Sequence, residues 1–232
     1  DVTDLVHPTN VFMAERISKI IDLDICGIDI MAETLTKPIE NTGGAVLEVN
    51  AGPGFRMHLQ PSSGLPRNVA SNVVDMLFPP GEDSRIPIIA VTGTNGKTTT
   101  TRLIAHIAKM RGKKVGYTTS DGVYIQNRLL MKGDCTGPAS AEFVLKDPTV
   151  NYAVLESARG GLLRAGLGFK KCDIGVVTNV AGDHLGLKGI HTIEQLAKVK
   201  GVIPETVKPN GYAVLNADDD LVFAMANNVE CQ

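Results

Sequence analysis

The residues with the clearest chemistry form a short loop of glycine, threonine and lysine. It consists of Gly93, Thr94, Asn95, Gly96, Lys97, Thr98 and Thr99. In a phosphate-binding loop, backbone N–H groups cradle phosphate oxygens, a lysine reaches the terminal phosphates, and a Ser or Thr hydroxyl holds Mg²⁺. The general pattern has a glycine six residues before the lysine, where this chain has Val91, so the loop is tighter. The alternative is a threonine-rich helix start with good N-caps.

Strands and helices that could position this loop alternate along the second part of the chain. Apolar runs predict buried strands at residues 86–91, 115–118, 152–155, 174–177 and 212–215. Helical spacing is found at residues 98–110, 139–145 and 192–202. In the first of these helices we expect Leu103, Ile104, Ile107 and Ala108 to form the buried face. The alternation predicts an α/β fold with a mostly parallel sheet flanked by helices.

Polar clusters follow each of the predicted strands. Because ligands bind outside the carboxyl ends of strands in an open α/β sheet, we expect these clusters to meet at one edge. Glu156 directly follows one strand, and Asp183 and His184 follow another. Glu156 could bind a metal. A lone histidine such as His184 is more often a hydrogen-bonded loop residue, and it accepts Mg²⁺ less readily than Zn²⁺.

Composition and charge limit the classes of function. The chain has 232 residues, a net charge of −2 and mixed acids and bases, which argues against nucleic acid or an anionic membrane as a partner. No apolar run approaches the ~20 residues of a membrane span. The four cysteines have no metal-ligand spacing, so we expect reduced thiols and a cytoplasmic location. We also expect a homo-oligomer.

Residues 1–80 differ in pattern from residues 81–232. A helical pattern at 10–23 precedes two strand-like runs, 25–31 and 45–49, and a Pro/Gly-rich linker leads us to place a domain boundary near Gly81. Asp29 lies in the first strand, and Glu48 and Asn50 face one side of the second. Three such oxygen donors suit Mg²⁺, whereas the alternative is an edge strand with a solvated polar face.

Two motifs resemble the Mur ligase family, which joins amino acids by amide bonds. TGTNGKT is similar to the family's ATP loop, and TNVAGDHLG is similar to its TN-x-x-x-DH-L stretch. The resemblance implies ATP as cofactor, with Glu156 and His184 binding a second Mg²⁺. It also implies a carbamylated lysine on the helix around 192–202, where alignment favours Lys200 over Lys198. Either lysine could instead be an ordinary solvated side chain.

The first part resembles the end of an ATP-grasp domain. GIDIM followed by EVNAGPGF carries the likeness, which implies that Asp29, Glu48 and Asn50 hold catalytic Mg²⁺ ions. An ATP-grasp end followed by a Mur-like ATPase domain resembles the cyanophycin synthetase family over essentially the whole chain. That family makes an aspartate/arginine polymer: the ATP-grasp half adds L-aspartate, and the Mur-like half attaches L-arginine to the aspartate side chain. We would then expect catalytic roles for Lys97, Glu156, His184 and Lys200.

The resemblance also implies missing parts and leaves alternatives. The rest of the ATP-grasp domain should precede Asp1, and a Mur C-terminal domain should follow Gln232, so we expect these residues alone to bind ATP but turn over poorly. Another amide ligase of the Mur or folylpolyglutamate group would not explain residues 1–77. A nucleotide-binding module without ligation is the other alternative. Arg159 and Arg164 could bind a carboxylate or phosphate, or could form a helix-start salt bridge. Weaker substrate-contact candidates are Ser120, Asp121 and Thr136.

Overall fold

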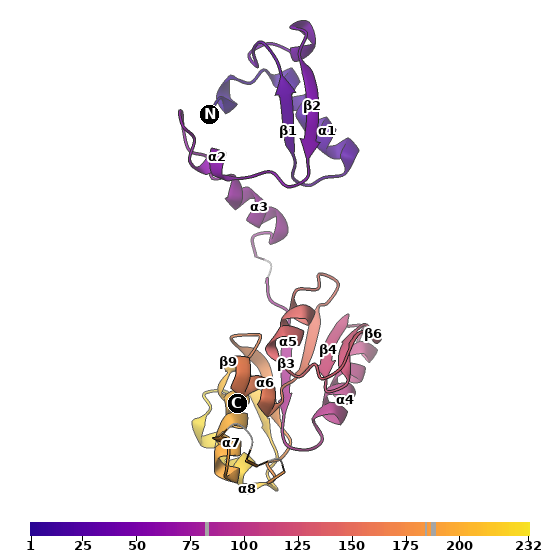
Figure 1. The fold of residues 1–232 in the computed structure, drawn as a ribbon, viewed down its shortest axis with the longest axis vertical. Coiled ribbons are helices and arrows are strands. Elements are labelled where there is room, and N and C mark those ends of the chain that lie inside the picture. The colour runs from indigo at the N-terminus through magenta and orange to yellow at the C-terminus, as the bar shows by residue number, and fades with distance from the viewer. Residues whose placement is uncertain (82–83, 184, 187–188) are drawn as a thin grey trace. The chain divides into compact units, whose positions relative to one another are not determined.

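The computed structural model describes residues 1–81, 84–183, 185–186 and 189–232. These residues fall into two compact units, Asp1–Ser84 and Arg85–Gln232 (Figure 1). His184, a predicted metal ligand, lies outside the described residues. No helix in the described ranges is both long enough and apolar enough to cross a bilayer.

The first unit is a helix and a two-stranded antiparallel ribbon with short helices around them. Its elements are η1 Thr3–Leu5, α1 Pro8–Ile21, β1 Gly27–Met31, η2 Ile39–Asn41, β2 Ala45–Asn50, α2 Arg56–Leu59 and α3 Val69–Leu77. Among its described residues only Asn10 and Ile39 are fully buried. The Asn10 amide ties α1 to the β1–β2 connection, because its Nδ2 donates to the carbonyls of Leu35 and Lys37. These two bonds join residues 25 and 27 positions apart and so hold the helix against the ribbon.

The second unit is a seven-stranded sheet with helices on both faces. Its first elements are β3 Ile88–Thr92, α4 Lys97–Met110, β4 Val115–Thr119, β5 Gly122–Ile125, β6 Arg128–Lys132, α5 Pro138–Leu145 and β7 Tyr152–Glu156. They are followed by α6 Arg159–Ala165, β8 Cys172–Val177, α7 Ile193–Glu205, β9 Val207–Leu215, α8 Asp220–Phe223 and η4 Ala224–Asn228. The strand order is β6-β5-β4-β7-β3-β8-β9. The pairs β4–β7, β7–β3, β3–β8 and β8–β9 are parallel. The sheet is therefore mostly parallel, which confirms the predicted fold class.

Alternating side chains of the central strands fill two cores. Ile88 and Ala90 of β3 point into a cluster with residues of α5 and α7, whereas Ile89 and Val91 point into a cluster with α4. This alternation is the period of two expected of a strand that is covered on both faces. The parallel strands therefore all end at one edge, directly before the polar clusters identified in the sequence.

The predicted buried face of α4 is right for Ala108, which is buried, and for Ile104, which packs half-buried against the core, but wrong for Leu103 and Ile107. Thr101, Ala105 and Ala108 are the buried residues of this helix, while Leu103 is 58% exposed and Ile107 is 62% exposed. Small side chains bring the helix axis close to the sheet, and the preceding loop fixes which side of the helix faces inward. Apolar spacing alone could not distinguish this stripe from the neighbouring one.

The hairpin of β5 and β6 was not predicted. Its two-residue turn consists of Gln126 and Asn127, both with positive φ (49° and 68°), which matches a type I′ turn. The two strands add antiparallel pairs at the β4 edge of the sheet. The hairpin brings the chain back to Asp134 and Thr136, beside the carboxyl end of β7.

Candidate active site

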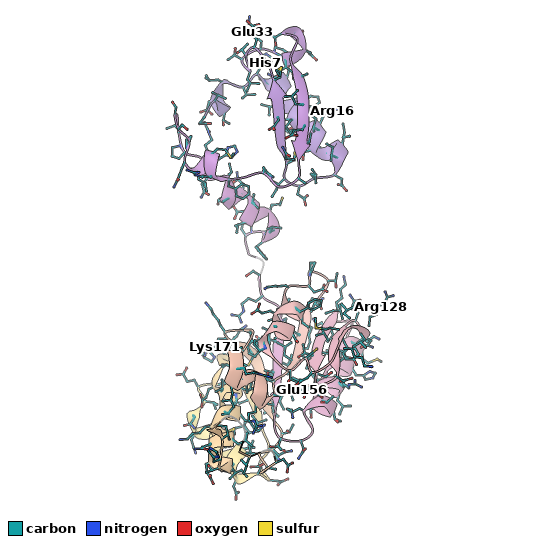
Figure 2. The ribbon with its side chains drawn as sticks, in the orientation of Figure 1. His7, Arg16, Glu33, Arg128, Glu156 and Lys171 are labelled. Carbon is teal, nitrogen blue, oxygen red and sulfur yellow. The ribbon has the colours of Figure 1, made fainter. Side chains whose placement is uncertain are left out.

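A pocket of about 310 Å³ lies where β3, β4 and β7 end and α4 begins. Its walls come from the glycine loop, the first turn of α4 and the segments after β4, β6 and β7. The lining residues are Thr94, Asn95, Gly96, Lys97, Thr98, Thr99, Ser120, Asp134, Thr136, Glu156 and Ala158. Figure 2 labels Glu156 within this unit. The loop residues predicted to bind nucleotide, apart from Gly93, thus line one cavity with Glu156.

Free backbone donors of this pocket lie at the start of α4. The first four N–H groups of a helix have no carbonyl partner within it, here those of residues 96–99 around the N-cap Gly96. The N–H groups of Thr94 and Asn95 are already used, because they donate to the Asn179 carbonyl and side chain over 2.9 Å each. The N–H groups of the loop that are available to an anion therefore begin at residue 96.

Two glycines give the loop its shape. Gly93 has φ 145° and Gly96 has φ 84°, conformations that side chains with a Cβ rarely adopt. At Gly93 a Cβ would also lie 1.9 Å from the Thr178 hydroxyl. Lys97 Nζ donates to the Thr94 carbonyl over 2.9 Å, so the side chain folds back over the loop that it closes.

Thr98, Ser120 and Glu156 form one hydrogen-bonded group. The Thr98 hydroxyl donates to Glu156 Oε2 over 2.8 Å, and the Ser120 N–H donates to the same oxygen over 3.2 Å. Glu156 is only 2% exposed. Burial raises the pKa of Glu156, while the Thr98 hydrogen bond and the Lys97 charge oppose the shift. A buried carboxylate, a hydroxyl and a nearby lysine are suitable surroundings for a hard cation and phosphate oxygens.

Lys200 of α7 lies beneath the glycine loop. Its Nζ donates to the Gly93 carbonyl over 2.6 Å, and the residue is 3% exposed. Burial lowers the pKa of Lys200 to about 7, with smaller contributions from the charges of Lys97 and Arg159. Lys198 is exposed and lines a different cavity, between α7 and the α8–η4 segment. Of the two candidate lysines, Lys200 is the one brought to the site.

Some of the other residues predicted from the sequence lie in the Glu156 pocket, and others lie outside it. Ser120 and Thr136 line the pocket, and Asp183 Oδ2 accepts a 3.3 Å hydrogen bond from Asn95 Nδ2. Asp121 instead pairs with Arg102 and accepts the Tyr124 hydroxyl. Asp134 is a pocket residue that the sequence analysis missed. Its only signal was its place in a polar run after a strand, which the unpredicted hairpin concealed.

The first unit brings its three predicted metal ligands together. Asp29 is paired opposite Glu48 in the ribbon, and Asn50 Nδ2 donates to Glu48 Oε1 over 3.1 Å. Asp29 and Asn50 also line a cavity of about 710 Å³ within this unit. All three are exposed, and within the described residues no group of three or more His, Cys, Asp and Glu has metal-holding geometry. The cluster offers two carboxylates and one amide.

A comparison with known families agrees with this geometry. The model of the Mur ligase middle domain matches residues 91–232, from the end of β3 to the last residue. The chain belongs to the Mur ligase family. A solved Mur ligase, UDP-N-acetylmuramoyl-L-alanyl-D-glutamate–2,6-diaminopimelate ligase, is 27% identical with a TM-score of 0.52, over 68% of this chain and 31% of that chain.

Similarity to curated Mur-related proteins extends across both units. Cyanophycin synthetase of Synechocystis sp. is 63% identical over 100% of this chain, and that of Geminocystis herdmanii is 64% identical over 99%. The chain spans only 27% and 26% of the length of these two proteins. The matches therefore include residues 1–90, which the Mur ligase model leaves out.

Proposed function

We propose that this chain is the nucleotide-binding part of an ATP-dependent amide ligase that makes cyanophycin, the aspartate/arginine polymer. The observation that carries the proposal is the pocket in which a glycine loop, Lys97 and Thr98 face the buried Glu156. The choice of the aspartate/arginine polymer as product is supported by the 63–64% identity of this chain to the cyanophycin synthetases. In this proposal the second unit attaches L-arginine to the side-chain carboxylate of aspartate.

The reaction proceeds in two steps and needs no covalent enzyme intermediate. An oxygen of the substrate carboxylate attacks the γ-phosphorus of ATP, and the bond to ADP breaks to leave an acyl phosphate. The neutral amino group of arginine then attacks the acyl carbon, phosphate leaves, and the amine loses a proton. Carboxylate and triphosphate repel each other, so positive charge and aligned N–H groups are the main catalytic requirement.

The pocket has the groups needed to supply that field. The N–H groups of residues 96–99 bind the phosphate oxygens, and Lys97 leaves Thr94 to pair with the terminal phosphates. The Thr98 hydroxyl and the Glu156 carboxylate are hard oxygen donors, which would suit Mg²⁺. The family resemblance implies that Thr98 holds one Mg²⁺ and that Glu156 binds a second together with His184, which lies outside the described residues. Mg²⁺ held by these residues would supply positive charge to neutralise developing charge on the phosphates. Burial lowers the pKa of Lys200 to about 7, so a large share of this amine is neutral at neutral pH and suited to carbamylation, which would add a carboxylate to the site.

We assign the first unit to the end of an ATP-grasp domain that adds L-aspartate to the growing chain. The proposed boundaries are 1–80 for this part and 81–232 for the Mur-like part. Asp29, Glu48 and Asn50 would hold its Mg²⁺ ions, because they lie together on one face of the ribbon. Asp29 and Asn50 border the cavity of about 710 Å³, which would admit the phosphates.

Calorimetric titration of the chain with ATP and Mg²⁺ tests the nucleotide site. Lys97→Ala should weaken ATP binding by about tenfold or more, because a charge-assisted contact contributes roughly 1.5–3 kcal/mol. Lys109→Ala, at the other end of α4, should bind as the wild type does. ADP release that depends on both the polymer and L-arginine, measured on a full-length protein that contains this chain, then tests the ligase reaction. ATP binding that Lys97→Ala leaves unchanged would contradict the site.

A second candidate is an amide ligase with another acceptor. UDP-N-acetylmuramoylalanine–D-glutamate ligase of Thermoanaerobacter pseudethanolicus is 31% identical over 157 residues, which favours this alternative for the second unit. A panel of aspartate/arginine polymer, folate and muropeptide acceptors separates the two. ADP release with a muropeptide and none with the polymer would favour the alternative.

A further inference from the structure

The glycine loop is held by a second loop, which comes from the far side of β3. We call residues 178–181, directly after β8, the clasp loop. Thr94 binds it at two points: its N–H donates to the Asn179 carbonyl over 2.9 Å, and its hydroxyl accepts the Ala181 N–H over 2.9 Å. The Thr178 hydroxyl donates to the Asn95 carbonyl over 2.7 Å. Backbone and side chains of the two loops are thus joined before any nucleotide is bound.

Asn179 makes the most specific of these contacts. Its Oδ1 accepts the Asn95 N–H over 2.9 Å, and its Nδ2 donates to the Asn95 carbonyl over 3.1 Å. Only one orientation of the amide satisfies both bonds, since one is an acceptor contact and the other a donor contact. The side chain therefore pairs with the Asn95 backbone as a neighbouring strand would. It fixes the orientation of the peptide groups of Asn95, the residue immediately before Gly96.

The clasp loop is itself anchored by the segment after β9. Asn216 Nδ2 donates to the Thr178 carbonyl over 3.0 Å, and Asp219 Oδ2 accepts the Val180 N–H over 2.7 Å. The other oxygen of Asp219 accepts the N–H groups of Leu221 and Val222 at the start of α8. Two residues of the polar segment after β9, Asn216 and Asp219, thus support the clasp loop.

We propose that Asn179 is a positioning residue for nucleotide binding. It fixes the Asn95 peptide so that the free N–H groups of residues 96–99 face the phosphates before nucleotide arrives. The ligand is a nucleoside di- or triphosphate, because the N–H groups that Asn179 helps to position lie at the start of α4, where phosphate groups bind. The inference rests on the proposed nucleotide site, but it concerns a residue that touches the loop and not the ligand.

Amide hydrogen exchange of the nucleotide-free chain tests the contact directly. In the wild type the Asn95 N–H should be protected, and adding ADP should protect residues 96–99 while leaving Asn95 unchanged. Asn179→Ala should remove the protection of Asn95. The wild-type measurement needs no variant, so it remains informative if Asn179→Ala fails to fold. Rapid exchange of the wild-type Asn95 N–H until ADP is added would overturn the proposal.

Binding of ATP, ADP and AMP then separates positioning from general support of the fold. Asn179→Ala should raise the Kd of ATP and ADP by about tenfold, the effect of one to two net hydrogen bonds, and change that of AMP least. Asn216→Ala, which loosens only the anchor, should have a smaller effect. Asn227→Ala, an exposed asparagine of η4, is the matched control.

Each outcome has a distinct meaning. A wild-type chain that binds no nucleotide overturns the proposed function and, with it, the positioning role. Unchanged ADP affinity in Asn179→Ala, with nucleotide still bound by the wild type, overturns the positioning role alone. Equal loss for ATP, ADP and AMP, together with a lowered Tm, would show that Asn179 supports the fold and does not position the loop.

Discussion

The Thr98 hydroxyl donates to Glu156 Oε2 over 2.8 Å, which joins the start of α4 to the end of β7. Thr98 and Glu156 are 58 residues apart in the chain. A carboxylate that is 2% exposed has little water to stabilise its charge, so its hydrogen bonds and the nearby Lys97 must do so. The contact places a buried carboxylate oxygen beside the first turn of α4, where the proposed nucleotide site begins.

Glu156→Gln should weaken nucleotide binding only when Mg²⁺ is present. The amide keeps an oxygen for Thr98 and Ser120 but loses the charge that a cation needs. We expect ATP affinity in Mg²⁺ to fall by about tenfold, or about 1.4 kcal/mol, and affinity in EDTA to stay equal or rise. Calorimetry in the two buffers checks this. Glu142→Gln on the exposed face of α5 is the control, and an equal loss in both buffers would contradict a metal role.

Lys200 should make the stability of the second unit depend on pH. The folded chain releases the Lys200 proton near pH 7, whereas the unfolded chain keeps it to about 10.5. Between these values the unfolded state binds more protons, so the free energy of unfolding rises with pH by about 1.4 kcal/mol per unit. The gain in stability from deprotonating Lys200 is complete above pH 10.5, the pKa of the unfolded chain, and is lost as the pH falls toward 7.

Lys200→Met should remove that slope. Urea unfolding between pH 7 and 9.5, in buffer free of carbon dioxide, gives the comparison. Lys198→Met, at the exposed position on the same helix, should keep the wild-type slope. Parallel stability curves for wild type and Lys200→Met would show that Lys200 does not titrate in this range.

Gly93→Ala should destabilise the chain more than a positive φ alone explains. The added methyl would meet the Thr178 hydroxyl at 1.9 Å, so we expect a loss of about 2–4 kcal/mol. Gly112→Ala is the matched control: its φ is 77° but nothing lies within 4 Å, so about 1 kcal/mol is expected. Thermal unfolding checks the difference. Equal losses at the two glycines would mean that the loops separate easily at Thr178.

The ribbon of the first unit should bind a divalent cation independently of the nucleotide pocket. In a Glu156→Gln background, Asp29→Asn should weaken Mn²⁺ binding by about tenfold, because it removes one of two carboxylates. Electron paramagnetic resonance of free Mn²⁺ measures this. Glu40→Gln, an exposed acid of η2, serves as the control. Retained Mn²⁺ binding in Asp29→Asn would favour the alternative of a solvated polar edge.

The sequence predicted the parts of the fold that local pattern determines. Continuous apolar runs identified the parallel strands, because strands covered on both faces are apolar throughout. The loop at Gly93 was recognisable because its glycines and lysine have fixed spacing. The turn at Gln126 and Asn127 was missed because neither residue is a glycine, although both have positive φ.

Tertiary contacts explain what the sequence could not predict. Lys198 and Lys200 lie on the same helix, and only packing beneath Gly93 buries one of them. The pairing of Asn179 with Asn95 joins residues 84 positions apart. Such a contact leaves no periodic signal. The inward face of α4 likewise depended on the loop that precedes it.

The hydrogen bond from Lys97 to the Thr94 carbonyl means that the loop's own cation is occupied at rest. An arriving triphosphate must therefore displace the ammonium group from an internal partner, which makes binding an exchange of contacts. The measured heat of association will understate the strength of the lysine–phosphate pair by the enthalpy of the bond given up. Phosphoryl transfer to the substrate carboxylate and release of ADP would let the ammonium return to Thr94, so the empty site resets itself for the next turnover.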